Sequence, residues 1–151
     1  QLSAEHSQEA LDLAQRFHQR PIYQAVREGA IHREQAVSLT VGGLTLNGVV
    51  DLVGHDFVLD FKTDSDIQPH HHQFQLWAYS KATGKSTAYL AYLRHDYLHP
   101  FDGESLARLN DRASMLIENL TAGDFAPNAN PTSCGTCSYG EICDSRVNSS
   151  R

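Results

Sequence analysis

The sequence lacks any uninterrupted apolar run of the roughly 20 residues that a membrane-spanning helix requires, which argues against a helical membrane protein. It contains no internal repeat and no low-complexity linker. No basic stretch followed by an apolar one marks its start, so we expect no secretory signal. Basic residues are few, with 12 Lys and Arg scattered against 18 Asp and Glu, and the net charge is −6 at pH 7. Surfaces that bind duplex DNA need clustered Lys and Arg. The excess of acidic residues therefore disfavours nucleic-acid binding through charge alone.

Cysteine is also scarce, and its three copies, Cys134, Cys137 and Cys143, stand close together near the C-terminus. An odd, clustered set argues against a secreted disulfide framework and favours metal or redox chemistry in a reducing compartment. A zinc site completed by a His is one reading of the spacing. Three unliganded thiols, with Cys134 and Cys137 able to oxidise, are another.

The 151 residues, 40% of them hydrophobic, suffice for about one domain with a real core. Hydrophobic periodicity predicts helices within 2–29 broken at Pro21, strands over 35–41, 44–53 and 55–62, a helix over 66–83, a strand over 87–94 and a helix over 105–121. This order predicts a mixed α/β fold, with a central mixed sheet flanked by helices. We expect a core over 1–122 and a Cys-containing tail over 123–151 that packs on it.

The last predicted helix carries one apolar stripe. Its members are Leu106, Leu109, Ala113, Leu116, Ile117 and Leu120. We expect all six to be buried.

The second predicted hairpin contains the candidate catalytic residues, two carboxylates and a lysine. If His55 and Asp56 form a two-residue turn, the antiparallel register places Asp51 opposite Asp60. The period of a strand then puts Lys62 on the same face. These strands are otherwise apolar, and buried charges are costly unless they are paired or bound to metal. Mg²⁺ or Mn²⁺ held by both carboxylates and the Phe61 carbonyl would account for all three charges. A buried Lys–Asp salt bridge with a spare Asp is the alternative.

Three elements of the sequence together resemble RecB-type nucleases of the PD-(D/E)xK superfamily. They are G-x-x-D at 48–51, D-x-K-T at 60–63 and Q-x-x-x-Y at 75–79, preceded by Arg33-Glu34. The resemblance implies a restriction-endonuclease-like core and a Mg²⁺- or Mn²⁺-dependent deoxyribonuclease, an exonuclease rather than an endonuclease. It also implies single-stranded DNA as substrate, a helicase domain or subunit as partner in DNA repair, and a cytoplasmic, nucleoid-associated location. The implied catalytic residues are Asp51, Asp60, Lys62, Gln75 and Tyr79. For Gln75 and Tyr79, an amide and a phenol that pack where a helix meets the sheet are the alternative.

The sequence departs from that pattern at two points. Related nucleases carry a further metal-ligating His on an upstream helix, but His6 and His18 do not lie in the expected small-residue context. We therefore expect that helix before residue 1. Glu34 is either an accessory carboxylate near the site or an anchor for the start of the strand. In related nucleases a C-terminal Cys trio joins one upstream Cys to hold a 4Fe-4S cluster, and Cys134, Cys137 and Cys143 lack that fourth partner here.

Other readings remain open. The same core could serve as a catalytically inactive structural DNA-binding domain, although the intact Asp60-x-Lys62 favours the enzyme. It could also be a stand-alone or CRISPR-adaptation nuclease.

Residues 70–72 are three consecutive His, whose side chains point in different directions on a helix. This run favours a solvated helix end, with a contact to phosphate as the alternative.

Overall fold

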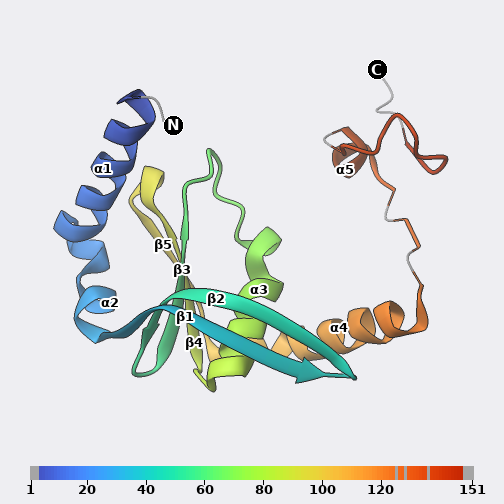
Figure 1. Cartoon of the computed structure of the whole chain (residues 1–151), viewed down its shortest axis with the longest axis horizontal. Helices are drawn as coiled ribbons and strands as arrows, with labels where there is room; N and C mark the ends of the chain where they lie inside the picture. Colours follow the sequence, from blue (N-terminus) through green and yellow to red (C-terminus); the bar gives the residue numbers. More distant parts are fainter. Residues whose placement is uncertain (1–3, 125, 128, 136, 148–151) are drawn as a thin grey trace.

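The computed structural model describes residues 4–124, 126–127, 129–135 and 137–147. In chain order the elements are α1 (Ala4–Gln19), η1 (Pro21–Tyr23), α2 (Gln24–Gly29), β1 (Ala30–Val41), β2 (Leu44–Gly54), β3 (Phe57–Lys62), α3 (Pro69–Thr83), β4 (Thr87–Tyr92), η2 (Leu93–His95), β5 (Tyr97–Phe101), α4 (Gly103–Ala122) and α5 (Pro131–Gly135). The strands form one sheet in the order β1-β2-β3-β4-β5, in which β3 and β4 are parallel and the other neighbours antiparallel. Figure 1 shows α1 and α2 on one side of this sheet and α3 and α4 on the other. The predicted fold class, a central mixed sheet flanked by helices, is confirmed.

Helix α3 makes the crossover that the parallel pair β3–β4 requires. It begins at Pro69, three residues later than predicted. A residue before proline is driven out of the helical region, and Gln68 has φ −131° and ψ 70°, so residues 63–68 form a loop. The helix ends as expected at Gly84, whose φ of 70° is the left-handed conformation that glycine adopts readily.

Strand β5 was missed from the sequence, and the strand predicted over 87–94 ends at Tyr92. Residues 93–95 instead form a short 3-10 turn, and Asp96 follows in the left-handed region with φ 48°. The chain then returns antiparallel along β4. Pro100 lies within this strand, and proline is tolerated there because β5 is at the edge of the sheet.

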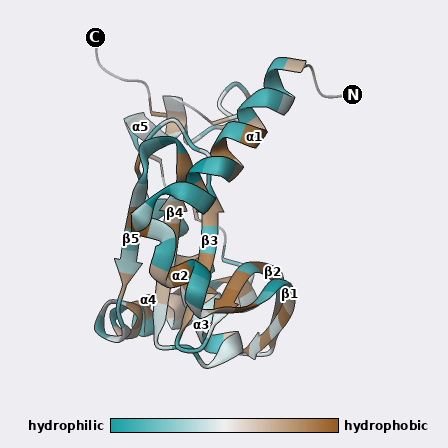
Figure 2. Ribbon diagram, turned by 90° about the vertical axis from the view of Figure 1, so that its left-hand side faces the viewer, coloured by the Kyte–Doolittle hydropathy of each residue, from teal (hydrophilic) through white to brown (hydrophobic). Residues whose placement is uncertain are grey.

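Each face of the sheet contributes to a buried core. Towards α3 the core contains Val50, Val53, Val58, Leu76 and Leu90. Towards α1 and α2 it contains Phe17, Tyr23, Val26, Leu52 and Leu59. In Figure 2, α1 and α2 lie in front of the sheet and carry both hydrophobic and hydrophilic residues, as helices with only one covered face do.

The tip of the β1–β2 hairpin packs on α3 and α4. Its residues Leu39, Val41 and Leu44 contact a cluster that includes Trp77 and Ile117. This contact covers only one side of α4. The prediction that all six residues of its apolar stripe are buried is therefore wrong for two of them, since Leu116 is 43% and Leu120 47% exposed.

Figure 1 shows α5 set apart from the sheet. That the tail packs on the core stays a prediction. Residues 1–3 of the expected core and residues 125, 128, 136 and 148–151 of the expected tail lie outside the described residues. Within the described part of the chain, no helix combines the length and the apolar character needed to cross a membrane.

The β2–β3 hairpin forms with the predicted register. His55 and Asp56 form the bend, and Val53 pairs with Val58 and Leu52 with Leu59. A Cβ added at Gly54 would lie 2.1 Å from Cε1 of Phe57. The Phe57 ring is also confined by Gly29 and by an edge-on contact with Tyr89 at 5.6 Å between centroids. Glycine at position 54 therefore leaves the space in which this ring lies.

We expect Gly54→Ala to lower the free energy of unfolding by about 1–3 kcal/mol, because the Phe57 ring must move within a filled space. Urea denaturation would measure the loss. The matched control is Gly103→Ala at the start of α4, where an added Cβ meets nothing closer than 3.5 Å and the change should stay within about 0.5 kcal/mol. Equal stability of both variants would refute this account of the hairpin.

Candidate functional site

The β2–β3 hairpin brings the two predicted carboxylates together. The observed register, carried one residue beyond the Leu52–Leu59 pair, sets Asp51 opposite Asp60. The Asp51 carboxylate accepts a hydrogen bond of 2.7 Å from the backbone N–H of Phe61. This bond fixes Asp51 against β3, directly beside the backbone of the residue whose carbonyl was predicted as a metal ligand.

Asp60 is almost completely buried, with 4% of its surface exposed, and it is paired with Lys62. The Lys62 Nζ lies 2.6 Å from Oδ2 of Asp60. Both side chains therefore leave the same face of β3, as predicted from the strand period. Oδ2 accepts no hydrogen bond from any other described group, so this buried oxygen still has room for a further electropositive partner.

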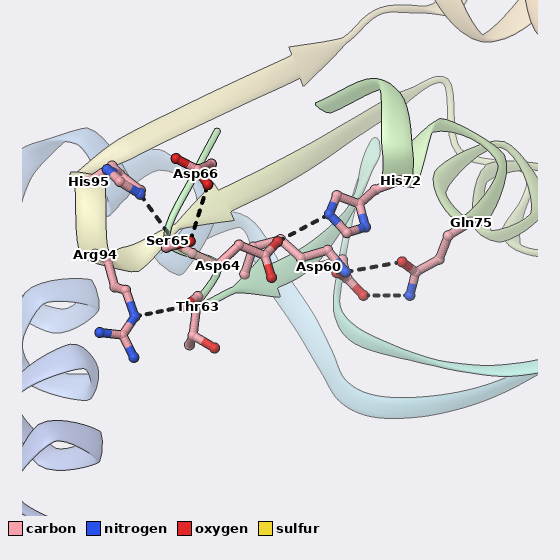
Figure 3. Close-up of polar contacts among 10 residues, drawn as sticks. Asp60, Thr63, Asp64, Ser65, Asp66, His72, Gln75, Arg94 and His95 are labelled. Carbon is pink, nitrogen blue, oxygen red and sulfur yellow. Dashed lines mark hydrogen bonds and ion pairs between the residues drawn. The ribbon is translucent and has the colours of Figure 1, made fainter. Parts of the chain in front are cut away.

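Gln75 of α3 bridges this pair. Its Nε2 donates to Oδ1 of Asp60 at 2.9 Å, and its Oε1 accepts from Lys62 Nζ at 3.1 Å. Figure 3 shows Gln75 and Asp60 extending towards one another from helix and strand. The amide can satisfy both neighbours only in this orientation, because one faces it as an acceptor and the other as a donor.

Tyr79 lies one helical turn beyond Gln75 and accepts a hydrogen bond of 3.1 Å from its Nε2. The Tyr79 ring packs against Gly48, where an added Cβ would lie 2.8 Å from Cε1 of that ring. The glycine of the G-x-x-D element thus allows the tyrosine of the Q-x-x-x-Y element to approach β2. Tyr79 itself is buried and reaches the charged pair only through Gln75.

Burial raises the pKa of the Asp60 carboxyl above its ordinary value of 3.8. The hydrogen bond and charge of Lys62 oppose this shift, whereas the charge of Asp51 adds to it. Two neighbouring carboxylates in a desolvated site are unfavourable as anions unless a cation joins them.

The donors present fit a hard divalent cation. They are two carboxylates, one with an oxygen whose one partner among the described residues is Lys62, and a nearby backbone carbonyl. Within the described residues no three His, Cys, Asp or Glu side chains are grouped closely enough to surround an ion by themselves. Mg²⁺ usually takes one or two carboxylates and keeps several waters, which fits the two carboxylates present here.

A cleft of about 430 Å³ opens beside Asp51, between α1 and the sheet. Its polar lining residues are His18, Arg33, Glu34, Asp51 and Thr63. Arg33 pairs with Leu52 and Gln35 with Val50, so Glu34 lies opposite Asp51 on β1. Glu34 has a φ of 49°, a conformation uncommon for a residue with a side chain and frequent at functional sites.

His18 is the residue that the sequence analysis set aside and the structure brings to this cleft. Ala10, Ala14 and His18 all line the cleft, and their spacing of four places them on one face of α1. Two alanines at this interval are a small-residue context on that face, and this signal could have identified the histidine. The prediction of a ligand His before residue 1 remains a prediction.

The remaining predicted positions lie elsewhere. The three cysteines are free thiols in and after α5, and Cys134 Sγ accepts a hydrogen bond of 3.5 Å from the Val147 N–H. His70 and His71 are exposed at the start of α3, as expected of a solvated helix end. His72 instead contacts Asp64 at 3.1 Å, and Figure 3 shows this pair near Asp60.

A mixed sheet whose central hairpin presents an acid, a second acid and a lysine beside an open cleft has the restriction-endonuclease-like architecture. The chain belongs to the PD-(D/E)XK nuclease superfamily, because the sequence profile of that family matches residues 2–144. Among solved structures, the crystal structure of SSO0001 is similar in fold. It has a TM-score of 0.51 and 18% sequence identity, and the match covers 95% of this chain and 81% of that one. None of the curated proteins compared with the chain matches it significantly.

Membership of this superfamily indicates the general type of reaction. Proteins of this superfamily are metal-dependent nucleases that generally use Mg²⁺ or Mn²⁺, which agrees with the oxygen donors of the β2–β3 hairpin. The nuclease fold implies DNA as substrate.

We expect Gln75→Ala to lower the free energy of unfolding by about 1–3 kcal/mol, because Asp60 loses a donor and Lys62 an acceptor inside the protein. Gln73→Ala is the matched control, since it removes the same group from a position on a different side of α3. Urea denaturation of both variants would measure the difference. A loss no larger at position 75 than at position 73 would show that the bridge contributes nothing to stability.

The raised pKa of Asp60 predicts a pH dependence of stability. The folded state holds this proton more tightly than the unfolded state, so the contribution of Asp60 is present below about pH 4 and is lost as pH rises through the raised pKa. Without added metal, wild type should therefore lose stability relative to Asp60→Asn over that window. Chemical denaturation at several pH values would show parallel curves if the carboxyl were unperturbed.

Proposed function

We propose that the chain is a Mg²⁺- or Mn²⁺-dependent deoxyribonuclease of the RecB type, which hydrolyses phosphodiester bonds at the β2–β3 hairpin. The observation that carries the proposal is the Asp60–Lys62 pair at 2.6 Å, with Asp51 beside it. Asp51, Asp60 and the carbonyl of Phe61 would hold the metal. When bound, the metal would supply positive charge to the phosphate and lower the pKa of a bound water.

Lys62 would act on the reacting phosphate or on the attacking water. Its ammonium has three donors, and Asp60 and Gln75 accept from it in the structure. The third donor can reach a phosphate oxygen or hold the water in line for attack. Because Asp60 and Gln75 hold the ammonium in place, it would stabilise the charge that develops in the transition state without moving.

Gln75 and Tyr79 would be positioning residues. Gln75 holds both charged partners at once, and Tyr79 limits the rotation of its amide. His18 and Glu34 line the cleft next to Asp51 and are candidates for a further metal ligand and an accessory carboxylate. Both would need only side-chain rearrangement, because they already face the same space.

The order of the three motif elements supports the narrower assignment to a RecB-type exonuclease that acts on single-stranded DNA. We extend the proposal to a helicase partner in DNA repair and to a location at the nucleoid. Cys134, Cys137 and Cys143 would ligate a 4Fe-4S cluster in the intact protein. Such a cluster takes four thiolates, so it needs one from outside this sequence.

A nuclease assay tests the proposal with single-stranded oligonucleotides labelled at the 5′ or the 3′ end. Cleavage should require Mg²⁺ or Mn²⁺, stop with EDTA, and fall by about 100-fold or more in Lys62→Ala and Asp60→Asn. Lys81→Ala, at an exposed position of α3, is the control and should cleave like wild type. Products that shorten stepwise from one end would support an exonuclease, and internal fragments an endonuclease.

Cleavage that resists EDTA and is equal in all variants would come from a contaminant and end the proposal. Metal-dependent DNA binding without any cleavage would favour the second candidate, a structural DNA-binding domain. The intact Asp60–Lys62–Gln75 cluster stands against that alternative, because an inactive domain has no need of two buried charges.

A further inference from the structure

The cleft beside Asp51 is more apolar than phosphodiester hydrolysis requires. Its apolar lining includes Leu13, Ala14, Phe17, Leu52, Phe61 and Leu93. Metal, water and phosphate are all polar and gain nothing from such walls. The apolar surfaces of DNA are chiefly the faces of its bases. The walls of the cleft therefore suit a nucleobase, whereas the group that reacts is the phosphate.

Two aromatic rings stand in this wall. Phe17 of α1 and Phe61 of β3 meet edge to face, with centroids 4.8 Å apart and planes at 83°. Every nucleobase can stack on such a ring regardless of sequence, and this stacking is the usual source of affinity for single strands. Phe61 is also the residue whose N–H binds Asp51, so a base on this wall would lie next to the carboxylate.

The size and the rim of the cleft suit one nucleotide. A volume of about 430 Å³ lies within the roughly 300–1,000 Å³ of pockets that enclose small molecules. A duplex cannot enter, because its bases are stacked on both faces and paired at their edges. Arg33 lines the same cleft, is exposed, and forms no ion pair in the part of the chain that the structure describes, so its guanidinium is available to a backbone phosphate.

We propose that the cleft between α1 and the sheet receives one unpaired nucleobase of a DNA single strand and so places the adjoining phosphate at Asp51. This inference rests on the proposed nuclease function and deepens it, because the base-binding cleft would be the physical cause of a single-strand preference. The required contact is between a base and the half-buried ring of Phe61, which the buried ring of Phe17 supports from behind, whatever the identity of the base.

The test compares two labelled single-stranded oligonucleotides of equal length, one with normal bases and one with a run of abasic sites. Wild type with Mn²⁺ should cleave the normal strand about tenfold or more faster than the abasic one. Ala14→Phe fills the cleft from α1 and should bring this ratio close to one. Leu11→Phe adds the same ring to an exposed position of α1, where the side chain is 57% exposed, and should keep the wild-type ratio.

Equal rates of wild type on the two strands, or a wild-type ratio in Ala14→Phe, would overturn the inference while leaving the nuclease intact. If nothing is cleaved, the nuclease proposal fails, and fluorescence anisotropy of the same two strands without metal still decides whether the cleft binds a base. The wild-type comparison needs no variant to fold, so a failure of Ala14→Phe to fold does not remove the test.

Discussion

The buried ion pair between Asp60 and Lys62 is the constraint on which the site depends. Two charges withdrawn from water are tolerated only when their geometry is close and their remaining hydrogen-bonding groups are satisfied. Here Lys62 Nζ and Asp60 Oδ2 are 2.6 Å apart, and the amide of Gln75 on α3 forms a hydrogen bond with each of the two side chains. The crossover helix α3 is thus part of the site as well as of the core, since its displacement would remove the Gln75 amide from both members of the pair.

The two walls of the cleft are held by different forces. The sheet wall belongs to the buried core, whereas α1 is tied to the turn after β4 by ion pairs at the surface. Arg94 pairs with Glu9, and Arg16 lies 3.7 Å from Asp96. Exposed pairs of this kind contribute only about 0–1 kcal/mol each. Phe17 gives α1 its buried anchor, so the helix is fixed mainly where it also forms the aromatic wall.

Sequence patterns predicted the site better than they predicted the edges of the fold. The bend at His55 and Asp56 and the register of β2 with β3 follow from local alternation, and the structure confirms them. The edge strand β5 was missed because Pro100 interrupts its pattern, and an edge strand tolerates what a central strand cannot. The apolar stripe of α4 extends beyond the surface that the β1–β2 hairpin covers, so Leu116 remains half exposed.

The sequence by itself determined which side chains are neighbours within one element. Strand period placed Lys62 beside Asp60, and helix period placed Tyr79 beside Gln75. Only the tertiary structure decided that Gln75 lies between the two charges and that His18 faces the same cleft as Asp51. The physical reason is that backbone geometry sets spacing along a strand or helix, whereas the approach of separate elements depends on how their apolar faces pack.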